Sequence, residues 1–162
     1  MQAAKDSKLS HSIYAVAFKK GKSSLDFRIP TQEDFEGFTQ AKDKIDFLIN
    51  SGITEIPFEE LPDGQDLDEQ IRIFCPTWKD MFNPRQLLTL VTYVELINEA
   101  KELMRAEYEL DRVEAIATYL ALVCDRCVDK NCRLSHWQAS RAFSQAASGQ
   151  HALNLFWNYP EL

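Results

Sequence analysis

Glycine is scarce in this 162-residue chain, which contains five, at positions 21, 37, 52, 64 and 149. No two of them are two residues apart, so there is no Gly-x-Gly turn to bring the backbone close to a dinucleotide or a phosphate. The nucleophile elbow Gly-x-Ser-x-Gly is also absent. The sequence therefore lacks the glycine motifs of common cofactor, phosphate and hydrolase sites.

Long apolar runs are missing as well. No stretch approaches the roughly 18 apolar residues needed to cross a bilayer, and "MQAAKDSKLSHS" at the N-terminus lacks the apolar segment of a secretory signal. Three of the four cysteines fall within residues 124–132, which indicates a reducing compartment rather than a disulfide framework. We expect a cytoplasmic protein without membrane contacts.

The net charge of −7 is spread unevenly along the chain. Residues 1–30 hold six basic and two acidic residues, residues 31–82 hold four and thirteen, and residues 83–162 hold eight and ten. Because phosphate neutralisation needs a concentrated basic face, the acidic total argues against strong electrostatic binding of nucleic acid by this chain alone. Apolar residues make up 45% of the sequence, enough at this length for the core of one domain.

Apolar periodicity predicts the elements of the first half. Alternating apolar residues predict a β-hairpin in residues 13–29, with its turn at Gly21. Thr31 followed by Asp34 is a helix-capping pattern, and apolar residues every three or four positions predict a helix that ends at Gly52. The following segment, to residue 82, is acidic and contains three prolines, which predicts irregular structure.

The stretch "FNPRQLL" raises the question of catalysis. Asn-Pro opens the Asn-Pro-Pro-aromatic loop with which enzymes that methylate exocyclic amines hold the target nitrogen, but here Arg85 and Gln86 replace the second proline and the aromatic residue. Asn83, Pro84 and Gln86 instead suit the N-cap, N1 and N3 positions of a helix. We interpret the stretch as a helix start and predict no catalytic residue.

The second half is predicted to be helical. Helices over residues 83–108 and 111–131, joined by a short connection, should pack antiparallel. Ser135 followed by Gln138 predicts a fourth helix that ends near Gly149. The expected fold is a mainly helical α+β domain with an N-terminal β-hairpin and a bundle of about four helices. Its parts are a β-hairpin arm (1–30), a helix plus an acidic irregular segment (31–82) and a helical core (83–162).

The stretch "CDRCVDKNCRLSH" is a candidate metal site. Its Cys-x2-Cys-x4-Cys-x3-His spacing supplies four residues of the types that bind zinc tetrahedrally, Cys124, Cys127, Cys132 and His136. The first two lie in a strongly helical run, however, whereas zinc knuckles place their paired cysteines on a tight turn. Cysteine is also common as a small buried apolar residue. We expect no metal, and a small zinc-binding domain stays as an alternative.

Basic and aromatic residues are interleaved after residue 125. They are Arg126, Lys130, Arg133, Trp137, Arg141 and Phe143. This combination is typical of nucleic-acid surfaces, where cations contact phosphates and aromatic rings stack on bases. The alternative is that the cations lie at helix C-termini and the aromatic residues lie in the core.

Four stretches, in order along residues 14–162, carry a family resemblance. They are "RIPTQEDFEGF", "TWKDMFNPRQLLTLVTYVELI", "ATYLALVCDRCVDKNCRLSHW" and "GQHALNLFWNYPE". The last three are similar to W-x-D-L-F-x-P-R-Q-L-L-x-L, to A-x-Y-L-A-L-x-L-D-R-x-x-D-x-N-x-x-L-x-x-W and to G-R-Q-A-L-x-M-x-W-D-Y-x-E. Together they resemble the middle portion of large adenine-specific DNA methyltransferases, multidomain bacterial and archaeal proteins sometimes found with phage-defence genes. The residues at matching positions include Arg85, Gln86, Asp125, Arg126, Asp129, Asn131 and Trp137.

In that family the cofactor-binding glycine motif precedes this region and the Asp/Asn-Pro-Pro-Tyr motif follows it. The resemblance therefore implies a fragment of a longer enzyme that holds no cofactor itself, with S-adenosylmethionine bound by the parent enzyme. Leucine is usual in the family where this chain has Cys124, and other residues replace Cys127 and Cys132, which disfavours a zinc site.

The resemblance implies an accessory, non-catalytic domain that shapes the DNA cleft or supports the methyltransferase core of an enzyme that must expose its target base. Its expected partners are the rest of the methyltransferase and DNA. The expected nucleic-acid contacts are Arg85, Arg126, Lys130, Asn131, Arg133, Trp137 and Arg141. The alternative is a helical protein-interaction or scaffold module, with an apolar patch around Phe156, Trp157 and Tyr159 that would let the domain self-associate.

Overall fold

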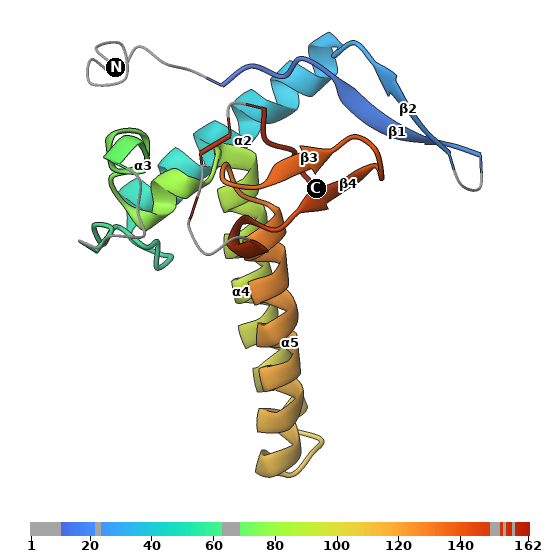
Figure 1. Cartoon of the computed structure of the whole chain (residues 1–162). Coiled ribbons are helices and arrows are strands. Elements are labelled where there is room, and N and C mark those ends of the chain that lie inside the picture. The colour runs from blue at the N-terminus through green and yellow to red at the C-terminus, as the bar shows by residue number, and fades with distance from the viewer. Residues whose placement is uncertain (1–10, 22–23, 63–68, 150–152, 154, 157) are drawn as a thin grey trace.

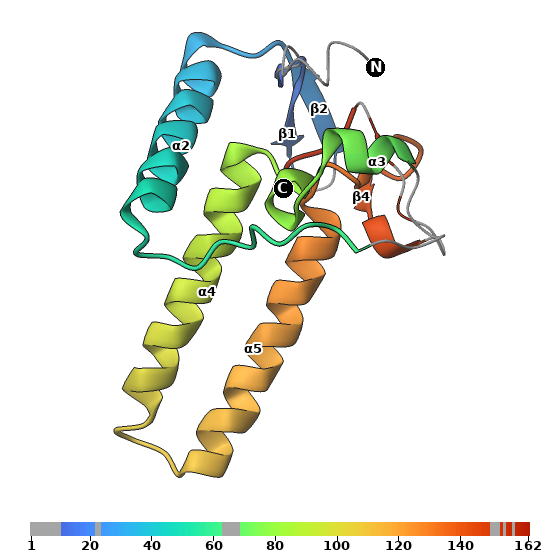
Figure 2. The same cartoon turned by 90° about the vertical axis from the view of Figure 1, so that its left-hand side faces the viewer.

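The computed structural model describes residues 11–21, 24–62, 69–149, 153, 155–156 and 158–162. In this part of the chain, a β-hairpin is followed by four α-helices and a second β-hairpin (Figures 1 and 2). Both hairpins lie at one end of the molecule, and the two longest helices project from that end as a pair (Figure 1). The predicted α+β, mainly helical fold class is confirmed.

The first hairpin consists of β1 (Val16–Lys20) and β2 (Ser24–Arg28). The strands are antiparallel, with Val16 opposite Arg28 and Lys20 opposite Ser24. Gly21 begins the turn with a φ of 71°, a conformation that glycine adopts at little cost. The hairpin predicted from the alternating residues is thus present.

Helix α2 (Gln32–Ser51) has the predicted ends. Thr31 and Asp34 form the capping box, and Gly52 ends the helix with a φ of 62°. Its buried residues are Ala41, Ile45 and Leu48, which recur at intervals of three or four and turn one side of the helix toward α4.

Helices α4 (Pro84–Met104) and α5 (Leu110–Lys130) run antiparallel, as predicted (Figure 2). We call the pair the helical hairpin. Its boundaries differ from the prediction, because α4 ends four residues before residue 108 and α5 begins at Leu110, with Glu109 as its N-cap. Asp111 therefore lies in the first turn, where a carboxylate also favours the helix dipole.

The fourth helix predicted from Ser135 to Gly149 is wrong. The segment forms β3 (His136–Gln138) and β4 (Phe143–Gln145), followed by the short 3-10 helix η2 (Ala147–Gly149). Ser135 is fully buried and its hydroxyl donates to the Cys132 carbonyl at 2.6 Å, so it closes the turn after α5 instead of capping a new helix. Ser144 is also buried and its hydroxyl donates to the Lys130 carbonyl at 2.7 Å, which holds β4 against the end of α5.

The segment predicted to be irregular contains α3 (Glu69–Phe74) and the 3-10 helix η1 (Trp78–Met81). Thr77 and Asp80 form a capping box at the start of η1. Ile71 and Cys75 are fully buried, so this segment supplies the centre of a core rather than a loose connection.

The core has two parts. One joins the segment around α3 to the residues after α5, and its buried members are Leu61, Ile71, Cys75, Met81, Cys132 and Leu134. The other lies between α2 and α4, and its buried members are Ile45, Leu48, Ile56, Leu87 and Val91. Phe82, directly before the start of α4, packs against both. None of the described helices is long and apolar enough to cross a membrane.

Candidate binding cleft

A cleft of about 830 Å³ opens where the first hairpin, the start of α2 and the C-terminal segment meet. Its walls come from residues 11–17, from Phe27 and the first turns of α2, from residues 73–80, and from residues 155–156 and 158–161. Arg85, Arg133 and Trp137 also line it. Chain segments far apart in the sequence therefore build this site.

The start of α4 anchors the C-terminal wall of the cleft. Asn83 is fully buried, and its side-chain oxygen accepts a hydrogen bond from the Gln86 backbone N–H at 2.9 Å. Its Nδ2 donates to Tyr159 Oη at 3.2 Å and to Glu161 Oε1 at 2.5 Å. Gln86 Nε2 donates to the Pro160 carbonyl at 3.1 Å. The residues that cap α4 thus also hold the last residues of the chain.

Two of the cations that line the cleft have protein partners. Arg85 Nε lies 3.2 Å from Glu161 Oε2, and the Arg85 side chain remains 42% exposed. The Arg133 guanidinium donates to the backbone carbonyls of Asp80 and Phe74, at 2.5 and 3.4 Å. Arg133 therefore fixes residues 74–80 against the end of α5, whereas Arg85 is more open to a ligand.

His11 and Tyr159 meet in the cleft, with His11 Nδ1 2.7 Å from Tyr159 Oη. Desolvation, and secondly the charge of Arg133, lower the pKa of His11 from 6.5 to about 4, so the imidazole is neutral at pH 7. Tyr159 Oη also accepts a hydrogen bond from Asn83, and the tautomer of the neutral ring sets the direction of its hydrogen bond with His11 Nδ1. Burial raises the pKa of the Tyr159 hydroxyl, which keeps it protonated at neutral pH.

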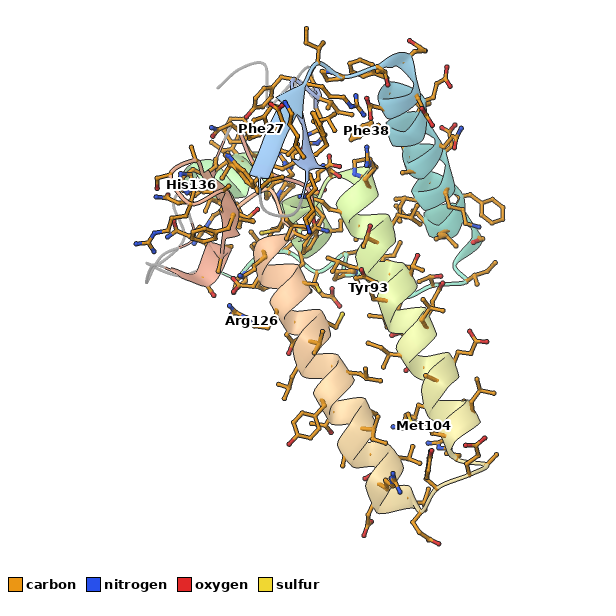
Figure 3. All side chains as sticks on the ribbon, turned by 90° about the vertical axis from the view of Figure 1, so that its right-hand side faces the viewer. Phe27, Phe38, Tyr93, Met104, Arg126 and His136 are labelled. Atoms are coloured by element: carbon orange, nitrogen blue, oxygen red, sulfur yellow. The ribbon has the colours of Figure 1, made fainter. Side chains whose placement is uncertain are left out.

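Aromatic rings line the side of the cleft next to the hairpins. The Trp137 ring meets Phe27 edge to face, with centroids 6.2 Å apart and an interplanar angle of 88°. Phe27 is 53% exposed and Trp137 is half-buried, so part of each ring faces solvent (Phe27 is labelled in Figure 3). This geometry leaves apolar ring surface for a planar ligand.

The carboxylates of the cleft are ion-paired. Asp34 accepts two hydrogen bonds from Arg28, at 2.6 and 2.9 Å, which together with bonds from Thr31 hold its pKa far below the usual range. Asp80 lies 2.6 Å from Lys79, and Glu161 pairs with Arg85. The charges in the cleft thus largely compensate one another.

The seven predicted nucleic-acid contacts do not lie together. Arg85, Arg133 and Trp137 line the cleft. Arg126 lies on α5, where it pairs with Asp129 at 2.9 Å.

The other three predicted nucleic-acid contacts lie near the end of α5 or beyond it. Lys130 is the last residue of α5 and is half-buried. Asn131 is buried, and its side-chain oxygen accepts from the Leu162 backbone N–H at 3.0 Å. Arg141 is exposed in the turn between β3 and β4.

The four candidate zinc ligands have separate surroundings. Cys132 is buried in the core, Cys124 and Cys127 are half-buried on α5, and the His136 ring packs on Phe156 with centroids 4.9 Å apart. Across the described residues, no three His, Cys, Asp or Glu side chains are grouped as metal ligands.

Sequence reasoning did not identify His11, Asn83 and Tyr159 as parts of one site. Asn83 was interpreted correctly as a helix cap, but its second role depends on residues more than 70 positions away. Phe156 and Tyr159, predicted as an exposed patch, are half-buried at the cleft, and Trp157 lies outside the described residues.

The chain matches no protein-family model, no curated protein and no solved structure. The methyltransferase resemblance therefore stays a prediction that rests on the four quoted stretches.

Proposed function

We propose that the chain is a non-catalytic accessory module that binds an unpaired DNA base, or a short single-stranded segment, in the cleft. The observation that carries the proposal is that Arg85, Arg133 and Trp137, three of the seven predicted contacts, line one cleft beside the exposed ring of Phe27. Aromatic side chains stack on bases of any sequence, and arginine supplies positive charge toward the backbone.

Stacking contributes more to this binding than charge. The carboxylates of the cleft are paired with cations and the whole chain carries −7, so few phosphates can be neutralised. With two arginines at the cleft, the logarithm of the affinity for single strands should fall with the logarithm of the salt concentration with a slope of about −1.4. A stacked base contributes about 1–3 kcal/mol.

The proposed role fits the methyltransferase resemblance. An enzyme that methylates the exocyclic amine of adenine must take the base out of the stack or act on single strands. A cleft that accepts an unpaired base would hold that base, or its displaced partner, beside a separate catalytic core. This chain has no Gly-x-Gly turn, so S-adenosylmethionine would be bound by other segments of the parent enzyme.

The test is a titration of the chain with fluorescent single-stranded, duplex and mismatched-bubble DNA at several salt concentrations. Arg85→Gln should weaken binding to single strands and reduce the salt slope by about 0.7. Arg105→Gln is the matched control, because Arg105 follows the other end of α4 and also pairs with a glutamate, Glu102. Equal affinities of both variants and the unaltered chain would contradict the proposal, as would tighter binding of duplex than of single strands.

A further inference from the structure

Within the part of the chain that the structure describes, the outer part of the helical hairpin is a layer two helices thick. In α4 the buried residues all lie in the first two turns, the last of them being Val91, and of the α5 residues Val113 alone is buried. Two packed helices cover only one side of each other, so a layer of this kind leaves two broad faces open (Figure 3).

One of these faces is apolar. Its exposed side chains are Tyr93 (43%), Leu96 (53%), Leu103 (68%), Tyr119 (73%) and Val123 (62%). Figure 3 views the helical hairpin from this side, with Tyr93 labelled on α4 and Met104 between the helices. We call these five residues the apolar face.

Helix geometry places the apolar-face residues of α4 and those of α5 on the same side of the helical hairpin. Leu96 and Leu103 each directly precede a less exposed residue of the seam between the helices, Ile97 and Met104, and Tyr119 likewise precedes Leu120. One residue earlier along a helix, the side-chain direction is turned by about 100° around the helix axis, in the same rotational sense on both helices. Because α4 and α5 run antiparallel, the apolar residues of both helices therefore point to the same face of the helical hairpin.

Basic residues follow the edge of this face on α5. Arg112 and Arg126 lie seven residues before and after Tyr119, and Lys130 lies seven after Val123, so all three continue the same side of the helix. Arg126 pairs with Asp129, yet its side chain is 64% exposed and directed away from α4 (Figure 3). The charges on this edge therefore suit an acidic ligand.

We propose that the apolar face binds an amphipathic helix of another polypeptide whose apolar stripe is flanked by acidic residues. The third helix would lie in the groove between α4 and α5, cover the five apolar residues and set its carboxylates against the basic edge of α5. From Tyr93 to Leu103 the face is about 15 Å long, which corresponds to about three helical turns of the partner. Apolar burial supplies the affinity, and the charged edge selects the partner.

A second copy of this chain does not fit the same face. If two copies stacked with the same orientation, their β-hairpins would collide, because both hairpins extend over this side of the molecule (Figure 1). In the opposite orientation the two α5 helices would cross antiparallel, and Arg112 of one copy would face Arg126 and Lys130 of the other. Steric overlap and like-charge repulsion thus favour an acidic partner of a different sequence.

The proposal is tested with a designed fluorescent peptide of about 18 residues, with leucines at helical spacing and glutamates on its flanks. A second peptide carries lysine in place of every glutamate. The full chain should bind the acidic peptide about tenfold more tightly, and the difference should shrink at about 0.5 M salt. Equal affinities for the two peptides, or no binding of either, would overturn the proposal.

Two residues of α5 provide the matched variants. Val123→Asp should weaken binding of the acidic peptide about tenfold, whereas Leu110→Asp should leave it nearly unchanged, because Leu110 is similarly exposed but lies about 140° around the helix from Val123. Circular dichroism checks that both variants keep their helices. Equal losses in the two variants would contradict the proposed face. Sedimentation equilibrium that shows a dimer, lost in Val123→Asp, would also contradict the proposal, because a second copy of the chain would then occupy the apolar face.

Discussion

Asn83 Nδ2 donates a 3.2 Å hydrogen bond to the Oη of Tyr159, a residue 76 positions further along the chain. The same amide group caps α4 through its oxygen, so one buried side chain joins the start of the helical hairpin to the wall of the cleft. Through Tyr159 the contact extends to His11. The stability of the cleft is therefore coupled to the start of α4.

Replacing Asn83 by alanine tests this coupling. Asn83→Ala removes the cap and leaves Tyr159 and Glu161 without a buried donor, so the free energy of unfolding should fall by about 1–3 kcal/mol. Asn98→Ala, an exposed position in the middle of α4, is the control and should change it by less than about 0.5 kcal/mol. Urea denaturation measures both, and similar losses would show that Asn83 has no special role.

Two glycines near α2 should respond to alanine in opposite directions. Gly52 ends the helix with a φ of 62°, so Gly52→Ala should destabilise the fold by about 1 kcal/mol. Gly37 lies inside the helix, and a methyl group there meets no atom within 4 Å, so Gly37→Ala should stabilise it by about 0.5–1 kcal/mol. In thermal unfolding, the midpoint temperature should be lower for Gly52→Ala and higher for Gly37→Ala than for the unaltered chain. A shift in the same direction for both would disprove the argument.

The pKa of His11 predicts a loss of stability in mild acid. Above pH 6.5 the ring is neutral in the folded and unfolded chain and contributes nothing. Between pH 6.5 and about 4 only the unfolded chain takes up the proton, so the free energy of unfolding falls across this range and levels off below it. His11→Gln should show a smaller fall between pH 7 and pH 5 in urea denaturation.

The same titration can be followed directly by NMR. The Cε1–H resonance of His11, assigned by its absence in His11→Gln, should titrate near pH 4 in the folded protein. A midpoint near pH 6.5 would mean that neither the desolvation of the ring nor the charge of Arg133 acts on His11.

The four cysteines should react with a thiol reagent in two groups. Cys75 and Cys132 are buried and burial raises their thiol pKa, so both should react only when the protein unfolds. Cys124 and Cys127 are half-buried on α5 and should react in the folded state. Reaction rates with and without denaturant measure this difference. If one equivalent of Zn²⁺ protected Cys124, Cys127 and Cys132 together, the zinc-binding alternative would replace this interpretation.

Much of the helical architecture could be predicted from the sequence. Thr31 with Asp34 and Asn83 with Gln86 mark helix starts because each pair bonds within a single turn, and Gly52 ends α2 through its own φ. The first hairpin follows from the alternation of apolar residues and a glycine turn. Local bonds and periodicity suffice for these elements.

The second hairpin shows where such local reasoning fails. Ser135 and Gln138 have the spacing of a capping pair, but the Ser135 hydroxyl is used by Cys132 and the neighbouring strand is held through Ser144 and Lys130. A short segment adopts strand or helix according to the partners that its buried polar groups find. Those partners belong to the end of α5.

The sequence by itself determined the helix boundaries near residues 31, 52 and 83, the first hairpin and the uneven charge, because these depend on neighbours within a few positions. Only the tertiary structure decided that Arg85, Arg133 and Trp137 share a cleft while Arg126 lies apart from them on α5. It also decided that no third element of the described chain covers the outer half of the helical hairpin. The physical reason is that a cleft and an open face are made by contacts between distant segments, which no periodicity along the chain specifies.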